Sequence, residues 1–307
     1  MSVLDRLGSF GRAASGRSDS AVAVVRPPSA TLRKATRLLI IYALSFLIVA
    51  TTMIPVLWMI KTSFETPEFM HSLQIQFWPI KFTWQNYLDV LQNPHALIFN
   101  SAYNSIFVAF FATVLNLALT ATAGYALSRF EFRGKALFGL YLLLFYMIPR
   151  TLLLIGLFVM LAKLHLINQH MGLIITYAAL GVPLAVWWLK GYFDSIPVEI
   201  EEQAMIDGCS RLGALRRVIV PLALPGVAAV GIIQFVDCWN EFQLALTIIQ
   251  TNTLQLLPVR IINFMGFQRT DWGPTMAFSV LVALPAIILF GIAQRNMISG
   301  LMSGFSK

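Results

Sequence analysis

Three polar side chains recur at three- and four-residue spacing inside an otherwise apolar stretch of the chain. Gln234, Asp237 and Glu241 lie within residues 221–247, and this spacing places them on one face of a helix. A second apolar stretch carries Arg150 directly after Pro149. Charges in long apolar helices are energetically costly, so they either pair with each other or contact a polar solute. Arg150 with Asp237 is one conceivable pair, and Glu241 could instead lie near the outer interface in contact with water.

The composition indicates that these helices lie in a membrane. Of the 307 residues 58% are hydrophobic and only 12% are charged, against about 25% charged in soluble domains. A hydrocarbon core of about 30 Å needs roughly 20 apolar residues in helical form. Six stretches qualify and predict an all-α transmembrane fold, with spans at about 38–60, 103–128, 137–162, 171–189, 221–247 and 274–293. The two cysteines are too few for a disulfide framework, and we expect no metal site.

The distribution of basic residues predicts the orientation. Residues 1–35 lack the pattern of a cleaved signal and are expected to form a disordered cytoplasmic tail before a transmembrane domain at 36–307. With the N-terminus inside, most of the 22 Lys and Arg residues fall in cytoplasmic segments, and the outer segments hold only Lys61, Lys81, Lys163, Arg260 and Arg269. This bias predicts a multi-pass membrane protein with both termini cytoplasmic.

A charged cytoplasmic segment at 195–220 separates the fourth and fifth spans. Pro197 with acidic residues in the next turns is typical of a helix start, and Gly208 followed by Ser210 is typical of a turn and a new N-cap. Three interpretations remain open. The segment is a solvated loop, a DNA-reading helix-turn-helix, or a docking helix for a cytoplasmic partner. Attachment to membrane spans at both ends leaves little freedom to enter a DNA groove.

The segment resembles the "EAA" loop of membrane subunits of bacterial ABC importers. Glu202, Gln203 and Ala204 stand for E-A-A, Asp207 and Gly208 for D-G, and Val220-Pro221 for the later part. Gln203 and Cys209 replace the usual alanines by residues of modest size. Residues 124–134 (GYALSRFEFRG), Trp239 to Phe242 (WNEF) and the C-terminal residues 294–307 are similar to carbohydrate-uptake permeases of the maltose type.

This resemblance implies a six-span type I importer permease of the bacterial inner membrane that forms half of a heterodimeric pore. Its partners would be a second permease subunit, a dimer of ABC ATPases, a solute-binding protein on the outer face and membrane lipid, with no nucleic acid. The chain itself would not be an enzyme and would hold no cofactor, because the only Gly-Lys pair, Gly134-Lys135, lacks a P-loop around it. ATP and Mg would be bound by the ATPase. The residues implied to couple to it are Glu202, Ala204, Asp207 and Gly208.

The candidate solute pathway consists of the polar residues inside the spans: Arg150, Asp237, Asn240, Glu241, Asn116 and Tyr177. Amide and aromatic groups suit a sugar or sugar derivative, and a fixed cation at Arg150 would favour an anionic sugar. A polyol or a glycerol-phosphate-type solute is the alternative. These side chains could equally hold the helices together. A lone secondary transporter is disfavoured because no internal repeat is evident, and a membrane enzyme because H-E-x-x-H and G-x-S-x-G are missing from the sequence.

Overall fold

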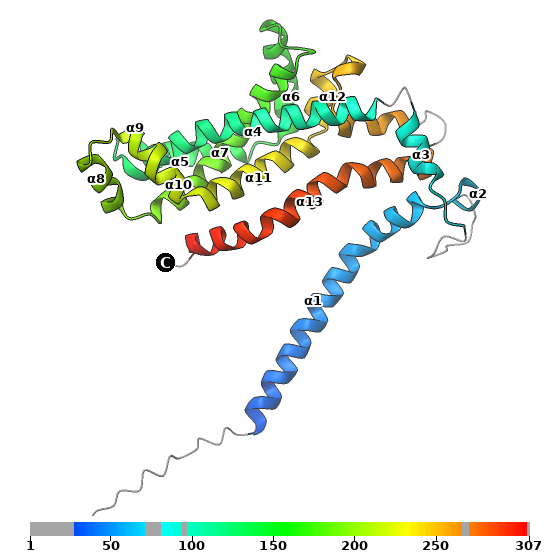
Figure 1. Ribbon diagram of the computed structural model, residues 1–307, viewed down its shortest axis with the longest axis horizontal. Coiled ribbons are helices and arrows are strands. Elements are labelled where there is room, and N and C mark those ends of the chain that lie inside the picture. The colour runs from blue at the N-terminus through cyan, green and yellow to red at the C-terminus, as the bar shows by residue number, and fades with distance from the viewer. Residues whose placement is uncertain (1–27, 71–80, 94–96, 266–269, 306–307) are drawn as a thin grey trace, which may run out of the picture. The chain divides into compact units, whose positions relative to one another are not determined.

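The computed structural model describes residues 28–70, 81–93, 97–265 and 270–305, and helices make up nearly all of this part (Figure 1). The chain divides into two units, Met1–Pro55 and Val56–Lys307. The first unit contains most of α1 (Pro28–Ser63). This helix begins inside the range predicted to be a tail, and residues 1–27 of that predicted tail lie outside the described residues. Its apolar side chains, among them Leu39 and Phe46, are exposed within the unit, as expected of a helix that faces lipid or another subunit.

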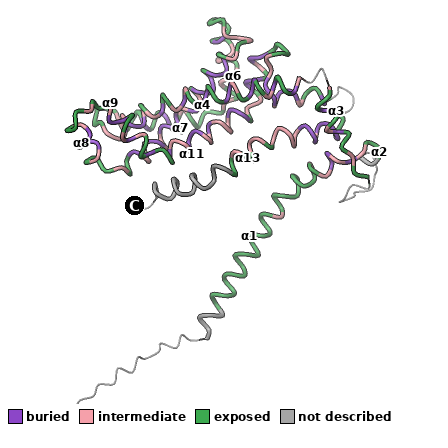
Figure 2. The backbone as a smooth tube through the Cα atoms, viewed as in Figure 1, coloured by how far each residue is buried: buried purple, intermediate pink, exposed green. Residues whose placement is uncertain are grey.

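Three helices form the centre of the second unit. They are α4 (Ile98–Arg129), α7 (His170–Asp194) and α11 (Leu224–Asn240), and α4 packs against both of the others. Their shared faces are buried (Figure 2). A fourth helix, α13 (Trp272–Phe305), packs along α11, where the indole Nε1 of Trp239 donates a 3.1 Å hydrogen bond to the carbonyl oxygen of Val282.

Side-chain amides connect the central helices at their middle. Asn116 of α4 donates from Nδ2 to the carbonyl oxygen of Ala178 at 2.8 Å. Gln234 of α11 donates from Nε2 to the carbonyl oxygen of Tyr177 at 3.1 Å. Both acceptors are adjacent residues of α7, within two turns before Pro183. The two amides therefore attach α4 and α11 to the same part of α7.

One of the six predicted spans is bent, and another begins at a bend. The stretch 137–162 is divided into α5 (Lys135–Tyr146) and α6 (Arg150–Lys163), which meet at 95°. Pro149 explains the break, because the residue before a proline is driven out of the helical region. The predicted span 221–247 begins at a second bend, where Arg211–Leu222, most of which belongs to the 195–220 segment, meets Leu224–Asn240 at 81°. There α11 ends at Asn240, and the short α12 (Gln243–Ile248) follows.

The number of spans therefore depends on how the bent pairs cross the membrane. Four helices are long and apolar enough to span by themselves: Arg33–Ser63, Ile98–Arg129, His170–Asp194 and Trp272–Gly291. The total rises to six if each bent pair forms one span. The structure thus bears out a helical membrane protein. It divides the predicted span 137–162 by a bend, and in the predicted span 221–247 the helix ends at Asn240.

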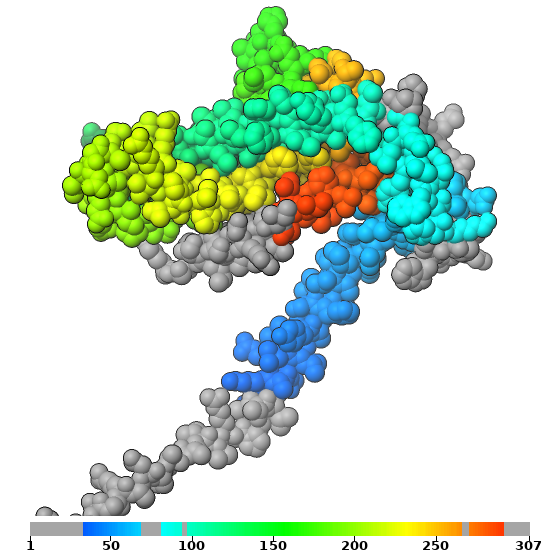
Figure 3. Space-filling view, viewed as in Figure 1, coloured from blue at the N-terminus to red at the C-terminus, as the bar shows by residue number. Residues whose placement is uncertain are grey.

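Short elements occupy the two ends of the second unit. One end holds α2 (Pro67–Met70), α3 (Gln85–Gln92) and the 3-10 helices Asn252–Leu254 and Leu257–Phe264. The opposite end holds α8 (Val198–Ile206), α9 (Arg211–Ala214), a π-helical turn at Leu215–Ile219 and α10 (Val220–Leu222). Figure 3 shows α3, in cyan, and the group around α8 and α9, in yellow-green, at opposite ends of α4. The single helix α4 thus connects both ends.

Candidate functional site

The segment 195–220 folds as the helix, turn and helix that the sequence predicts. Pro197 precedes α8, Gly208 adopts a left-handed φ of +91° after it, and the Ser210 hydroxyl accepts a 3.2 Å hydrogen bond from the backbone N–H of Gly213 to cap α9. A positive φ favours glycine because a Cβ would be strained there. The turn therefore requires glycine because of its backbone conformation. Steric room is not the reason, since a Cβ at Gly208 would meet nothing within 4 Å.

The proposed coupling residues differ in exposure. Glu202, Asp207 and Gly208 are exposed, whereas Ala204 is buried. Ile206 beside them is 84% exposed, which is high for a large apolar side chain. The outward face of α8 thus combines acidic and apolar groups, and its inward face packs on the rest of the second unit through Ala204.

A buried carboxylate on the inward face was missed by the sequence analysis. Glu201 is 3% exposed and accepts hydrogen bonds at both oxygens, from the Tyr125 hydroxyl and from Nε of Arg129, the latter at 2.9 Å. Arg129 also donates from Nη2 to the carbonyl oxygen of Ile196 at 2.8 Å. The spacing of Glu201 and Ala204 puts both on one helical face. That spacing was the available signal, but it does not say which face is inward.

A second contact joins the other side of the turn to the same helix end. The guanidinium of Arg211, the first residue of α9, lies 5.0 Å from the ring centroid of Phe130, which follows α4. Such cation–π contacts contribute about 0.5–1 kcal/mol at exposed sites. Both helices of the 195–220 segment are therefore attached to the C-terminal end of α4.

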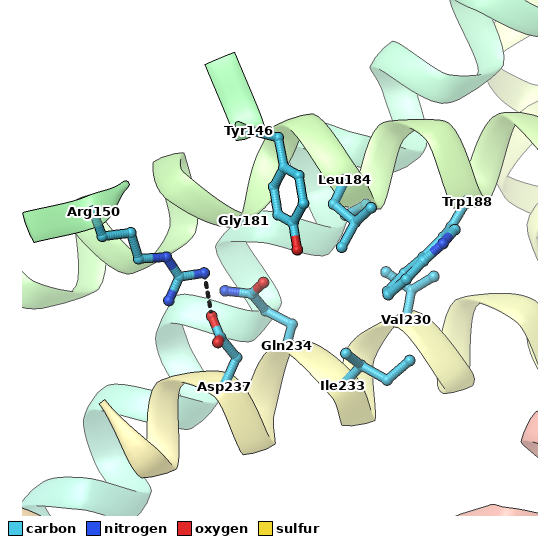
Figure 4. Close-up of a pocket in the computed structure, with 10 residues that line it drawn as sticks. Tyr146, Arg150, Gly181, Leu184, Trp188, Val230, Ile233, Gln234 and Asp237 are labelled. Carbon is cyan, nitrogen blue, oxygen red and sulfur yellow. Dashed lines mark hydrogen bonds and ion pairs between the residues drawn. The ribbon is translucent and has the colours of Figure 1, made fainter. Parts of the chain in front are cut away.

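A cavity of about 260 Å³ lies between the bent span and the central helices (Figure 4). Arg150 at the start of α6 and Asp237 of α11 form an ion pair across its edge, with 2.7 Å between Nη2 and Oδ2. Their side chains are 38% and 43% exposed. The lining alternates aromatic, aliphatic and polar groups, and its side chains include Tyr146, Leu184, Trp188, Val230, Ile233 and Gln234.

Gly181 of α7 is required for the shape of this cavity. A Cβ at position 181 would overlap the side-chain amide of Gln234, because the two would lie closer than van der Waals contact allows. The missing side chain therefore lets Gln234 reach the carbonyl oxygen of Tyr177 while it borders the cavity. The sequence analysis predicted two residues of this cavity, Arg150 and Asp237, as part of the solute pathway. It did not predict Tyr146, Trp188 or Gly181 as pathway residues.

The remaining pathway residues do not border this cavity. The Tyr177 hydroxyl donates a 2.8 Å hydrogen bond to Oε2 of Glu241. The Glu241 carboxylate also accepts from the backbone N–H groups of Leu244 and Ala245, at 2.9 and 3.1 Å, at the start of α12. Asn240 is exposed and donates to the carbonyl oxygen of Val236 in its own helix. Asn116 is fully buried and bonds α7, as described above.

Comparison with known proteins assigns the chain to a family. Residues 118–301 match the model of the binding-protein-dependent transport system inner membrane component family. The trehalose/maltose transport system permease protein MalG of Thermococcus litoralis is 35% identical over 88% of this chain and 96% of its own length. The sulfoquinovosyl glycerol transport system permease protein SmoH of Agrobacterium fabrum is 35% identical over 82% of this chain and 88% of its own.

A solved structure supports the fold. A chain of a bacterial ABC transporter involved in the import of the acidic polysaccharide alginate superposes with a TM-score of 0.73 and 22% identity, over 86% of this chain and 97% of that one. The chain therefore shares its overall fold with that transporter chain. The chain is a member of the family of inner membrane components of binding-protein-dependent transport systems, and its relatives include permeases of carbohydrate ABC importers.

Proposed function

We propose that this chain forms half of the translocation pathway of an ATP-driven importer for a sugar or sugar derivative. The cavity beside α11 carries the proposal, because it combines the rings of Tyr146 and Trp188 with the amide of Gln234. Sugars need apolar stacking faces and hydrogen-bonding groups at the same site. Relatives named for trehalose/maltose and for sulfoquinovosyl glycerol support this class of solute.

The partners follow from the family and from the surfaces left exposed. A second permease subunit completes a six-span plus six-span pore, and a solute-binding protein delivers solute at the outer face. Two ATPases bind ATP and Mg in the cytoplasm, where both termini of this chain lie. Lipid covers the exposed apolar faces, such as that of α1.

The 195–220 segment is the proposed coupling element. An ATPase cleft receives the exposed face of α8, with Glu202 as its charged contact and the turn at Asp207 and Gly208 directing α9. Buried Ala204 permits close packing on the inward side. When the ATPases close on ATP, α8 follows them, and the helices attached to it change the side on which the pathway opens.

The charge of the solute distinguishes two candidates. Asp237 neutralises Arg150 in the structure, so a neutral sugar needs no exchange of ion pairs. An anionic sugar would have to replace Asp237 at the guanidinium, and the relative that carries sulfoquinovosyl glycerol favours this second candidate. A polyol or glycerol-phosphate-type solute is the alternative within the same pathway.

Transport by the purified complex tests the proposal. The chain is co-purified with its second permease subunit and ATPases, reconstituted in liposomes, and supplied with the solute-binding protein and ATP. We expect ATP-dependent uptake of a sugar, neutral or anionic, that stops when the binding protein is omitted. Uptake that continues without ATP would contradict the proposed importer.

A further inference from the structure

Glu201 and Glu202 are neighbours in sequence but face opposite environments. Glu202 is exposed on α8, whereas Glu201 is buried with both oxygens bonded to residues of α4. We propose that Glu201 is a positioning residue that fixes α8 to the C-terminal end of α4, so that movement of α8 is delivered to α4. This inference rests on the proposed coupling role of the 195–220 segment and assigns a separate task to each glutamate.

The contact has the chemistry of a rigid attachment. Charge-assisted hydrogen bonds are about twice as strong as neutral ones, and the Arg129 and Glu201 side chains are only 6% and 3% exposed. Water therefore competes little for either group. The same guanidinium also donates a hydrogen bond to the carbonyl oxygen of Ile196, which lies between α7 and α8. One side chain thus fixes the end of α4, the end of α7 and the start of α8 together.

The chain connection alone does not give α8 this relation to α4. Along the sequence α8 is joined to α7 before it and to α9 after it, while α4 ends at Arg129, far from α8 in the chain. A displacement of α8 therefore reaches α4 either indirectly, through α7 packed against it, or directly, through side-chain contacts. The bonds of Glu201 to Tyr125 and Arg129 are ion-pair and hydrogen-bond contacts of this kind, and the contact of Arg211 with Phe130 assists them.

The N-terminal end of α4, opposite α8, is the region to which such a displacement would be transmitted. Ser101 accepts a 2.8 Å hydrogen bond from Nε of the buried Arg260, and Ser105 accepts one of 2.7 Å from the backbone N–H of Leu257. Asn104 donates to the carbonyl oxygen of Thr253 at 2.9 Å. A helix of 32 residues is about 48 Å long at 1.5 Å per residue. The segment 252–260 is thus attached to the same helix as α8, at the other end.

The first test measures the attachment itself and needs neither sugar nor ATPase. Spin labels are placed at Ile206→Cys on α8 and Arg133→Cys beyond α4, two exposed positions, in a Cys209→Ser background. We expect a narrow distribution of label–label distances in the otherwise native chain and a broad one in Glu201→Gln. A distribution that stays narrow in Glu201→Gln overturns the positioning role, whatever the transported solute is.

The second test separates positioning from docking in the reconstituted complex. We expect Glu201→Gln to retain bound ATPase but to raise the ATP hydrolysed per sugar transported about tenfold, a typical strength of coupling between sites. Glu202→Gln should instead reduce the amount of ATPase that co-purifies. Glu199→Gln, the same change at an exposed position of α8, is the matched control and should behave as the native complex.

Two further results decide the remaining cases. If the Glu201→Gln complex does not assemble, Tyr125→Phe is used, because it removes one donor to Glu201 and retains the ion pair with Arg129. A raised ratio of ATP to sugar in that variant supports the inference, and a native ratio overturns it. Failure of the native complex to transport any sugar contradicts the proposed function alone, since the label distances still test the attachment.

Discussion

Arg150 and Asp237 form an ion pair between α6 and α11, with 2.7 Å between Nη2 and Oδ2, at the edge of the cavity next to Gln234. The two residues lie on different helices, and α6 begins at Arg150 itself. The guanidinium therefore takes its position from the bend at Pro149. The pair can act as a structural connection between the bent span and α11, or as the place where a charged solute enters.

Asp237→Asn distinguishes these roles. The change frees the guanidinium of Arg150 from its carboxylate, so an anionic sugar no longer has to displace Asp237. If the pathway carries anions, we expect the half-saturating concentration of an anionic sugar to fall about tenfold. The reason is that the sugar gains one charge-assisted hydrogen bond to Arg150, and such a bond contributes about 1.5 kcal/mol. Uptake is measured in liposomes with a neutral sugar as the reference.

Arg150→Leu is the complementary variant. It should abolish uptake of the anionic sugar and spare the neutral one. Equal loss of both sugars in both variants would assign the pair to structure, because removal of either partner leaves a poorly compensated charge in the membrane part.

Gly181→Ala should distort the cavity. The added Cβ overlaps the Gln234 amide, so Gln234 must move and loses its bond to the carbonyl oxygen of Tyr177. We expect a destabilisation of about 1–3 kcal/mol, as in other overpacked sites, together with reduced uptake. The melting temperature of the complex in detergent measures the first effect.

Gly156→Ala is the matched control for that variant. Gly156 lies within α6, and a Cβ there would meet nothing within 4 Å. Alanine is favoured over glycine in a helix by about 1 kcal/mol, so this change should be neutral or slightly stabilising. An equal fall in melting temperature for both variants would show that the contact with Gln234 is not responsible.

Gly208→Val should uncouple ATP hydrolysis from uptake by changing the direction of α9. The position has room for a side chain, and the obstacle is the left-handed backbone at φ +91°. A left-handed conformation costs a non-glycine residue roughly 1–2 kcal/mol, but asparagine tolerates it better. We therefore expect Gly208→Asn to retain more sugar uptake per ATP than Gly208→Val. The reverse order, or normal uptake in Gly208→Val, would contradict this role of the turn.

The N-terminal end of α4 gives a prediction for the proposed solute-binding protein. The double change Ser101→Ala and Asn104→Ala removes bonds that attach the segment 252–260 to α4. We expect the stimulation of ATP hydrolysis by loaded binding protein to fall, while hydrolysis without binding protein stays unchanged. Tyr103→Phe, an exposed position on the same helix, serves as the control. Native stimulation in the double variant would contradict transmission through this end of α4.

Much of the fold follows from apolar length and from residues that start or end helices. Pro197, Gly208 and Ser210 predict the helix, turn and helix of residues 195–220, and all three act in the structure as expected. The bends at 95° and 81° do not follow. Apolar composition is continuous through Pro149, and membrane helices tolerate proline with small kinks as well as with large ones.

The site was less accessible to sequence reasoning because burial is decided by neighbouring helices. The spacing correctly places Gln234 and Asp237 on one face of α11, and Asp237 does meet Arg150. However, Glu241 follows the last residue of α11 and bonds the start of α12. Glu201 and Glu202 have the same side chain, and only the position of Arg129 at the end of α4 makes the first of them buried.

The bend between α5 and α6 has a consequence for how the chain enters the bilayer during synthesis. At 1.5 Å per residue α5 and α6 are about 18 and 21 Å long, and a hydrocarbon core is about 30 Å thick. Neither half can cross the membrane alone. The later helix α7 supplies partners for α5, since the Trp187 indole donates to the carbonyl oxygen of Gly139 at 3.1 Å. The bend therefore leaves α5 dependent for its packing on a helix that is synthesised after it.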